Sequence, residues 1–280
     1  MQGKLLLQAG TAFNVSQWNA FWEPSVSGDI ISVLDTTLGL RYGAQSTYRG
    51  NPNYTNRYSQ DFSATYVTGG HSYKFGVQND VLATNAQYIV NGNVNYTFLN
   101  GVPASITQFS TPYLRHDRGN DFGLYFQDKW RLGRLTLGYG ARLDWYYGWV
   151  PKQQTPGDPS PWPGAPQKNE WLGERSYDAV KSIPSWKDLN PRVDAAYDLF
   201  GSGRTAVKFA IGRYVAKTNV DVPTANNPIT TSVISASRSW TDTNKNYVPD
   251  CDLGDFGAQN LSASGGDVCG AINNQYFGKN

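Results

Sequence analysis

Period-two alternation of apolar residues is the feature that most constrains this chain. From Leu135 to Trp149 every odd position is apolar, whereas most even positions hold glycine, threonine or charged residues. Successive side chains of a β-strand point to opposite faces, so the pattern predicts a strand with one continuous apolar face. Shorter stretches alternate in the same way. We therefore expect about nine strands, which begin near residues 4, 30, 58, 71, 121, 135, 190, 205 and 231.

Composition supports an all-β fold and excludes several classes of protein. Aromatic residues make up 14% of the chain, and Met1 is the only methionine. This composition favours strands over helices. The longest uninterrupted apolar runs, such as Leu5 to Leu7, have three residues, whereas a membrane-spanning helix needs about 20. The formal net charge is only +2, so we expect no nucleic-acid partner.

The expected connections between strands alternate between short and long. Tight turns are predicted at Gly69-Gly70, Gly133 and Gly201 to Gly203, because glycine readily adopts the backbone angles of short hairpins. Long loops are rare inside compact soluble domains but are common on one side of an outer-membrane barrel. The predicted long loops cover residues 43–57, 91–120, 150–188, 217–230 and 241–280.

Two environments could produce such alternation: a soluble sandwich with its apolar face inside, or a membrane barrel with its apolar face toward lipid. Long strands, alternating loop lengths and aromatic residues at strand ends, as in Trp145 to Trp149, favour the barrel. We expect part of an antiparallel, up-and-down transmembrane β-barrel in the outer membrane of a Gram-negative bacterium. Its short turns would be periplasmic and its long loops extracellular.

The face opposite the apolar one carries charged residues that a dry core could not hold. We expect them to line the lumen, where they could bind a solute or pair with one another, and pairing is the interpretation we favour. The candidates are Arg142, Asp144, Arg192, Asp194, Asp198 and Lys208.

The C-terminal region contains a possible metal loop and the only two cysteines. Asp242, Asn244, Asn246 and Asp250 resemble the opening of a calcium loop, but the expected glycine and closing glutamate are missing. A structural calcium ion is therefore one interpretation, and a turn rich in Asp and Asn is the other. We expect no other cofactor. The spacing of Cys251 and Cys269 favours a local disulfide over a zinc site.

No arrangement of residues points to catalysis. The only histidines are His71 and His116, and no serine or cysteine stands in a nucleophile elbow. Gly201 to Ala206 matches a dinucleotide-binding pattern, but a strand follows it where a helix is required. We therefore expect no enzymatic activity.

Three segments resemble the barrel of TonB-dependent outer-membrane receptors, in particular the Oar-like branch: Phe122 to Arg131, Leu189 to Gly201, and Ser239 to Asp252. The resemblance implies a barrel of about 22 strands around a plug domain. It also implies import of bulky solutes, energised by an inner-membrane TonB complex that acts through the plug. The implied partners are outer-membrane lipid, that TonB complex and the outer-membrane assembly machinery.

The sequence departs from this family in its strand count and in lacking a plug domain, a TonB box and a signal peptide. We therefore expect it to be a portion of the barrel wall. Two alternatives stay open: a self-sufficient small barrel that acts as an adhesin or structural protein, and a soluble, secreted β-rich binding module. Dependence on detergent would separate the soluble module from both kinds of barrel.

Overall fold

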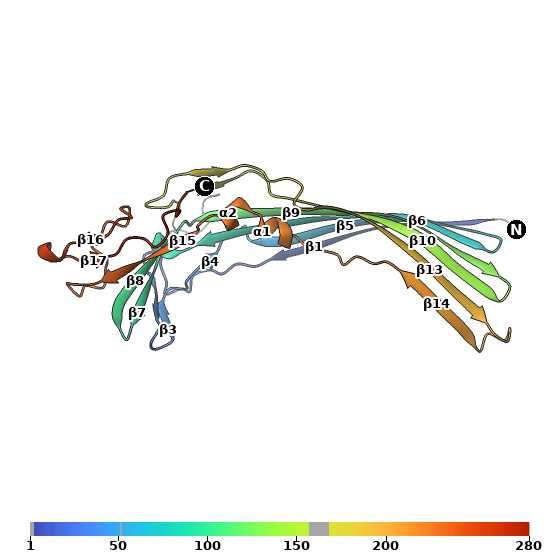
Figure 1. Cartoon of the computed structure of the whole chain (residues 1–280), viewed down its shortest axis with the longest axis horizontal. Helices are drawn as coiled ribbons and strands as arrows, with labels where there is room; N and C mark the ends of the chain where they lie inside the picture. Colours follow the sequence, from blue (N-terminus) through green and yellow to red (C-terminus); the bar gives the residue numbers. More distant parts are fainter. Residues whose placement is uncertain (1–2, 51, 157–167, 280) are drawn as a thin grey trace.

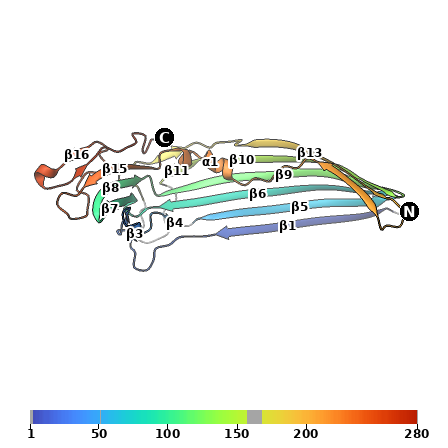
Figure 2. The same ribbon diagram turned by 60° about the horizontal axis from the view of Figure 1, so that its bottom comes forward.

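The fold is known from a computed structural model that describes residues 3–50, 52–156 and 168–279. It is an all-β structure with two large sheets placed end to end (Figures 1 and 2). Within these described residues, helical structure is limited to α1 (Asp221–Ala225), α2 (Pro228–Thr231) and two 3-10 turns, η1 (Asn91–Asn93) and η2 (Ser262–Ser264). No helix in the described ranges is long and apolar enough to cross a membrane.

The larger sheet, here called the wall sheet, has the strand order β1-β5-β6-β9-β10-β13-β14, with β4 paired beside β6. All its pairings are antiparallel, and no register shift interrupts them. Its strands are β1 (Lys4–Gln17), β4 (Tyr48–Arg49), β5 (Tyr54–Thr68), β6 (His71–Ile89), β9 (Tyr113–Leu132), β10 (Leu135–Trp149), β13 (Ser185–Asp198) and β14 (Ala206–Gly212).

The three predicted tight turns lie at one end of the wall sheet, which we call the short-turn end. Gly69 and Gly133 have φ values of 56° and 55°, a conformation that glycine adopts without steric cost. Gly201 and Gly203 share it in the β13–β14 turn. Lys4 pairs with Val67, so β1 begins at this end too, on the right in Figure 1. The long connections all leave from the opposite end, the long-loop end.

One face of the wall sheet carries a band of exposed apolar side chains. On β9 and β10 the band covers the paired segments Phe122–Leu132 and Leu135–Trp145. At ~3.3 Å per residue and a tilt of about 40°, eleven residues span roughly 28 Å, close to the apolar band of outer-membrane barrels. Leu124, Leu189 and Phe209 are 52%, 59% and 62% exposed. Water would disfavour such a face, whereas lipid would bury it.

The apolar band ends where polar side chains replace it on the same face. The Asn79 Nδ2 group donates to Gln60 Oε1 at 3.0 Å, and the Asn120 Nδ2 group donates to Asn79 Oδ1 at 2.8 Å. These residues follow the apolar band toward the long-loop end. Strands β6 and β9 continue well past them, so both project beyond the region that lipid would cover.

The second sheet, here called the loop sheet, stands beyond the long-loop end (Figure 1). Its order is β16-β17-β15-β8-β7-β2-β3, and only the β2–β7 pairing is parallel. Its buried core includes Phe98, Ile106 and Trp240. Its strands are β2 (Ser32–Asp35), β3 (Leu40–Gly43), β7 (Val94–Leu99), β8 (Val102–Phe109), β15 (Ser235–Thr241), β16 (Gln259–Asn260) and β17 (Val268–Cys269).

The sequence pattern misassigned parts of this region. The strands expected near residues 30 and 231 are β2 and β15 of the loop sheet and are not wall strands. Residues 91–120, expected as a loop, contain the β7–β8 hairpin and the start of β9. Protein covers β9 on both faces there, and Leu114 and Asp117 are buried. Alternation between an apolar and a polar face therefore disappears.

A small two-stranded sheet and the two short helices pack against the first residues of β9. The small sheet pairs β11 (Gln153–Thr155) with β12 (Arg175–Tyr177). Residues 157–167, within the loop expected at residues 150–188, lie outside the described residues.

Candidate functional site

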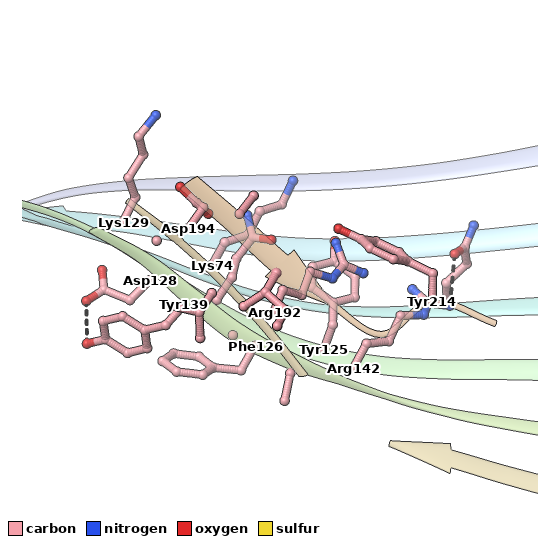
Figure 3. Close-up of a pocket in the computed structure, with 18 residues that line it drawn as sticks. Lys74, Tyr125, Phe126, Asp128, Lys129, Tyr139, Arg142, Arg192, Asp194 and Tyr214 are labelled. Atoms are coloured by element: carbon pink, nitrogen blue, oxygen red, sulfur yellow. Dashed lines mark hydrogen bonds between the residues drawn. The ribbon is translucent and has the colours of Figure 1, made fainter. Parts of the chain in front are cut away.

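The concave face of the wall sheet is polar and contains an open trough. The trough has a volume of about 560 Å³ and is lined by β6, β9, β10, β13 and β14. Figure 3 shows Lys74 and Lys129 on one side of these strands, with Phe126 and Tyr139 on the other. The alternation of the strands therefore separates a polar concave face from the apolar band on the convex face.

Arg142 and Asp144, two of the predicted lumen residues, form an ion pair on this face. Arg142 Nε lies 2.5 Å from Asp144 Oδ1, and the guanidinium also donates to Gln78 Oε1 on β6 at 3.2 Å. Asn190 Nδ2 on β13 donates to the other Asp144 oxygen at 2.7 Å. The ion pair itself lies within β10, and amide side chains tie it to β13 and, across β9, to β6.

The other four predicted lumen residues have different surroundings. The Arg192 guanidinium lies 5.3 Å from the centroid of the Tyr214 ring. Arg192 and Asp194 line the trough, and neither forms an ion pair with a described residue. The Asp198 carboxylate accepts backbone N–H groups of Gly201 and Gly203, so it shapes the β13–β14 turn. Lys208 is exposed on β14.

Glycines allow long side chains to lie flat against the concave face. A Cβ atom on Gly123 would stand 1.9 Å from Nη2 of Arg142, and one on Gly138 would stand 2.2 Å from Oδ1 of Asp194. Gly76 makes room for the Tyr125 ring in the same way. The face thus stays open although its side chains are large.

Sequence patterns did not reveal a second charged network on the concave face. Lys217 Nζ lies 2.5 Å from Asp80 Oδ2 and 3.3 Å from Asp121 Oδ2. The Arg57 guanidinium also reaches Asp80, at 2.7 Å. Lys217 follows β14, so the chain after that strand folds back over β6 and β9. Its separation of 137 residues from Asp80 explains why no local motif could predict the contact.

Asn227 fixes the two short helices to the wall. The side chain is fully buried, and its Nδ2 group donates to the His116 carbonyl and to Asp117 Oδ1. Its Oδ1 atom accepts the Ile229 N–H group and the Gln153 amide. One asparagine therefore joins β9, β11 and α2, in a hydrogen-bond arrangement that has no local sequence signature.

A polar cluster also lies on the convex face, near the short-turn end. Asp128 is buried and accepts hydrogen bonds from the Tyr139 hydroxyl at 2.8 Å and from the Ser72 backbone N–H at 3.2 Å. His71 Nδ1 is 2.7 Å from the same carboxylate, and its ring stacks between Tyr73 and Trp130. This histidine is part of an aromatic belt at the strand ends, the position typical of a membrane interface.

The loop at residues 242–250 is built on hydrogen bonds from its own backbone. Asp242 accepts N–H groups of Lys245, Asn246 and Tyr247. Asn246 Oδ1 accepts the Val248 N–H, and Asn244 Nδ2 donates to Asp250. These are the contacts of consecutive Asx turns. Within the described ranges, no group of three or more His, Cys, Asp or Glu side chains is placed to hold a metal ion.

Cys251 and Cys269 form a disulfide, with their Cα atoms 6.4 Å apart. Both cysteines belong to the core of the loop sheet, where they pack with Trp240. The bond joins the C-terminal loop to β17.

Comparison with known proteins identifies the architecture. The model of a protein family described as "Outer membrane beta barrel domain" matches residues 7–275, which cover both sheets. Comparisons with curated proteins and with solved structures gave no significant match. A family match over nearly the whole length agrees with the convex apolar band, the polar concave face and the segregation of short turns from long connections. The chain therefore belongs to the outer membrane beta barrel domain family, and its wall sheet is barrel wall in the outer membrane.

Proposed function

We propose that the chain is barrel wall of a TonB-dependent outer-membrane transporter that imports bulky solutes. The observation that carries this proposal is the wall sheet itself: an apolar convex band of membrane thickness with a polar, glycine-rich concave face. The resemblance of Phe122 to Arg131, and of two later segments, to TonB-dependent receptors adds the transport function.

A large barrel agrees with the edges of the wall sheet. Strands β1 and β14 stand at opposite ends of the strand order, and each has one edge without a described partner strand. Lipid cannot satisfy backbone N–H and C=O groups, so each edge needs a further strand. A path of seven strands that is still open belongs to a barrel wide enough to enclose a lumen.

The concave face suits a lumen that is occupied by water or protein. Gly123, Gly138 and Gly140 share this face with charged side chains such as Arg142 and Asp144. Small and charged residues of this kind cannot fill a narrow barrel interior with apolar packing. In the proposed function, a plug domain outside these residues fills the lumen and couples it to the inner-membrane TonB complex.

The proposal also assigns an orientation and partners. The short-turn end is periplasmic, and the long-loop end with the loop sheet is outside a Gram-negative cell. Outer-membrane lipid contacts the convex band, and the outer-membrane assembly machinery inserts the strands. Surface labelling of intact cells tests the orientation. A tag between Gly39 and Leu40 should react with an impermeant reagent, and a tag in the Gly133 turn should react only after the outer membrane is broken.

Uptake in deletion strains tests transport. A strain without the gene for this chain, and a strain without TonB, should both lose uptake of the same bulky solute from a panel of iron chelates, corrinoids and oligosaccharides. The gene restored on a plasmid should restore that uptake. TonB-dependent import would be contradicted if the strain without the gene still took up every solute in the panel. It would also be contradicted if uptake continued in the strain without TonB. The family assignment would still hold.

The alternatives make different predictions. A self-sufficient small barrel requires β1 and β14 to pair with each other, so a cysteine at Phe209 should crosslink to a cysteine at one of the positions along β1. A soluble module should stay folded and monodisperse without detergent. The exposed convex band argues against the soluble module, because Leu124, Leu143 and Phe75 would all face water.

A further inference from the structure

Charge is divided between the two halves of the concave face. Strand pairing places six cationic residues in three adjacent rows of the short-turn half, and Asp194 is the one carboxylate in those rows. We call this set of cationic residues the basic belt. Its members are Lys4, Lys74, Lys129, Arg131, Arg192 and Lys208. Asp198 lies one row nearer the turns, where its carboxylate accepts the backbone N–H groups of Gly201 and Gly203.

The belt contrasts with the rows toward the long-loop end, where cations are matched by carboxylates. There Arg142 pairs with Asp144, and Arg213 pairs with Asp188 at 2.5 Å. Lys217 bridges two further carboxylates in the same half. None of the six belt residues forms an ion pair with any described residue. The unbalanced positive charge is therefore confined to one half of the lumen wall.

The trough of about 560 Å³ overlaps the belt, because Lys74, Lys129 and Arg192 line it. Figure 3 shows these three side chains around the strand segment that carries Asp194. Gly138 and Gly140 form part of the floor, so β10 has no side chain of its own on this face at these two positions. The cations thus border an open, shallow surface that another molecule can approach closely.

We propose that the basic belt binds an acidic polypeptide segment inside the barrel. Like charges that stand unpaired repel one another, and an anionic partner would relieve this repulsion. The belt extends from β1 to β14, a width on the order of 30 Å at ~4.8 Å per strand. One small anion cannot contact cations spread so widely, whereas about nine residues of extended chain span that distance.

The inference rests on the proposed function in one respect, which is that protein rather than water alone occupies the lumen. It adds the chemistry of that protein: carboxylate side chains on the surface facing β6, β9 and β13, in the short-turn half. Asp194 interrupts the belt, so the partner should present a neutral or basic residue opposite it.

Peptide binding to the full chain in detergent tests the inference. The probe is a fluorescein-labelled peptide in which Glu and Ser alternate, followed by fluorescence anisotropy at low and moderate salt. We expect binding that weakens as salt rises, and no binding of the matching Lys–Ser peptide. Reversal of three belt charges, K74E/K129E/R192E, should weaken binding by roughly tenfold or more.

The matched control reverses three exposed lysines outside the belt, K152E/K181E/K187E, and changes the net charge equally. It should alter peptide affinity less than about twofold, because screened charges at a distance contribute little. A neutral variant, K74Q/K129Q/R192Q, should show an intermediate loss and covers the case in which the charge reversals prevent folding. Circular dichroism checks that each variant keeps its β-structure.

Three results would overturn the inference. Equal losses in the belt and control variants would show a general charge effect. Equal binding of the Lys–Ser peptide would show that charge is irrelevant. Displacement of the peptide by inorganic phosphate, at an ionic strength where chloride does not displace it, would show a small-anion site instead. The assay involves no uptake, so its result is independent of solute import.

Discussion

Single buried charges hold the connections of the loop sheet in place, and Asp35 is the clearest case. Its carboxylate is almost fully buried at the end of β2. It accepts the N–H groups of Thr37 and Leu38 in its own hairpin and of Asn100 and Gly101 in the β7–β8 turn. Burial raises the pKa of Asp35, but these four hydrogen bonds together outweigh it and hold the pKa below its ordinary value.

Replacing Asp35 with Asn should loosen both hairpin turns. A depressed pKa in the folded state means that the carboxylate stabilises the fold above the unfolded pKa of about 3.9, and that this stabilisation disappears as pH falls through the folded pKa. The variant should therefore exchange its Asn100 and Gly101 amides faster at pH 7, and this difference should shrink in strong acid. Hydrogen-exchange mass spectrometry measures both effects. Asp29→Asn, at an exposed position, is the control and should change neither turn.

Arg238 has an equivalent role for the C-terminal loop. The side chain is buried on β15 and donates to the carbonyl oxygens of Gly270, Asp255 and Gly257. Burial lowers the pKa of this guanidinium, but arginine keeps its proton in proteins. Its planar fork of donors binds three carbonyls from two stretches of the loop, one at Asp255 and Gly257 and the other at Gly270.

Arg238→Lys should therefore destabilise the loop although it preserves the charge. Lysine cannot reach three carbonyls with one ammonium group, and buried groups that lose partners cost about 1–3 kcal/mol each. We expect a loss of roughly 3 kcal/mol in the local opening free energy, measured by hydrogen exchange of the segment at residues 255–270. An unchanged exchange rate, or an equal effect of the exposed turn variant Arg204→Lys, would contradict this role.

At the scale of elements, the disulfide should decide whether the C-terminal loop stays attached to the loop sheet. Cys251 and Cys269 are 18 residues apart in the sequence, and both are buried. Closing a loop of this length stabilises a fold by about 3 kcal/mol in the chain-entropy model. A maleimide should label neither cysteine in the exported protein until a reductant is added. Labelling of untreated protein would refute a stable bond.

Elements with one lipid-facing side were predictable, and elements enclosed by protein were not. Strand β10 was expected from Leu135 to Trp149 and has these limits, because each of its faces keeps one environment along its length. The β7–β8 hairpin was missed. The alternation in Val94–Phe109 does not resemble that of the wall strands, and β2 reaches the hairpin by a parallel pairing that no local pattern encodes.

The candidate site was predictable in its residue types but not in its contacts. Alternation placed Arg142, Asp144 and Arg192 on one face, and the structure brings all three to the concave side. Alternation could not reveal that the Asp198 carboxylate would accept a backbone N–H group of its own hairpin turn. It also could not reveal that Lys217, from a distant segment, would form an ion pair with Asp80. Such contacts depend on how the chain folds over the sheet, and not on the strand pattern.

At the scale of the whole molecule, the two sheets place their apolar side chains in different environments. The wall sheet exposes apolar residues on its convex face, whereas the loop sheet encloses a buried core of its own. The long strands β6 and β9 connect the two. β6 begins in the apolar band and ends among the buried residues of the long-loop end, and the antiparallel β9 runs the opposite way between the same two regions. The loop sheet therefore stands beyond the long-loop end of the wall, on the side to which these two strands extend.

The assignment of the two faces of the wall predicts that an introduced arginine prevents assembly on the convex face and is tolerated on the concave face. Phe75 is 55% exposed in the middle of the convex band, and Gln127 lies on the concave face of the neighbouring strand, one row away. An arginine in the middle of a lipid-facing band costs about 2–4 kcal/mol, whereas a lumen position tolerates charge. Phe75→Arg should therefore reduce the amount of folded protein in the outer membrane severely. Gln127→Arg should leave it close to the wild-type amount.

Outer-membrane fractionation with heat-modifiable mobility on gels measures both variants. Phe75→Leu serves as the control for loss of the ring, and it should assemble normally because leucine is equally compatible with lipid. Assembly of Phe75→Arg at the wild-type level, together with failure of Gln127→Arg, would mean that the two faces had been exchanged. The apolar band would then belong to a protein interior, and the wall sheet would have to close around Phe75 rather than around Arg142.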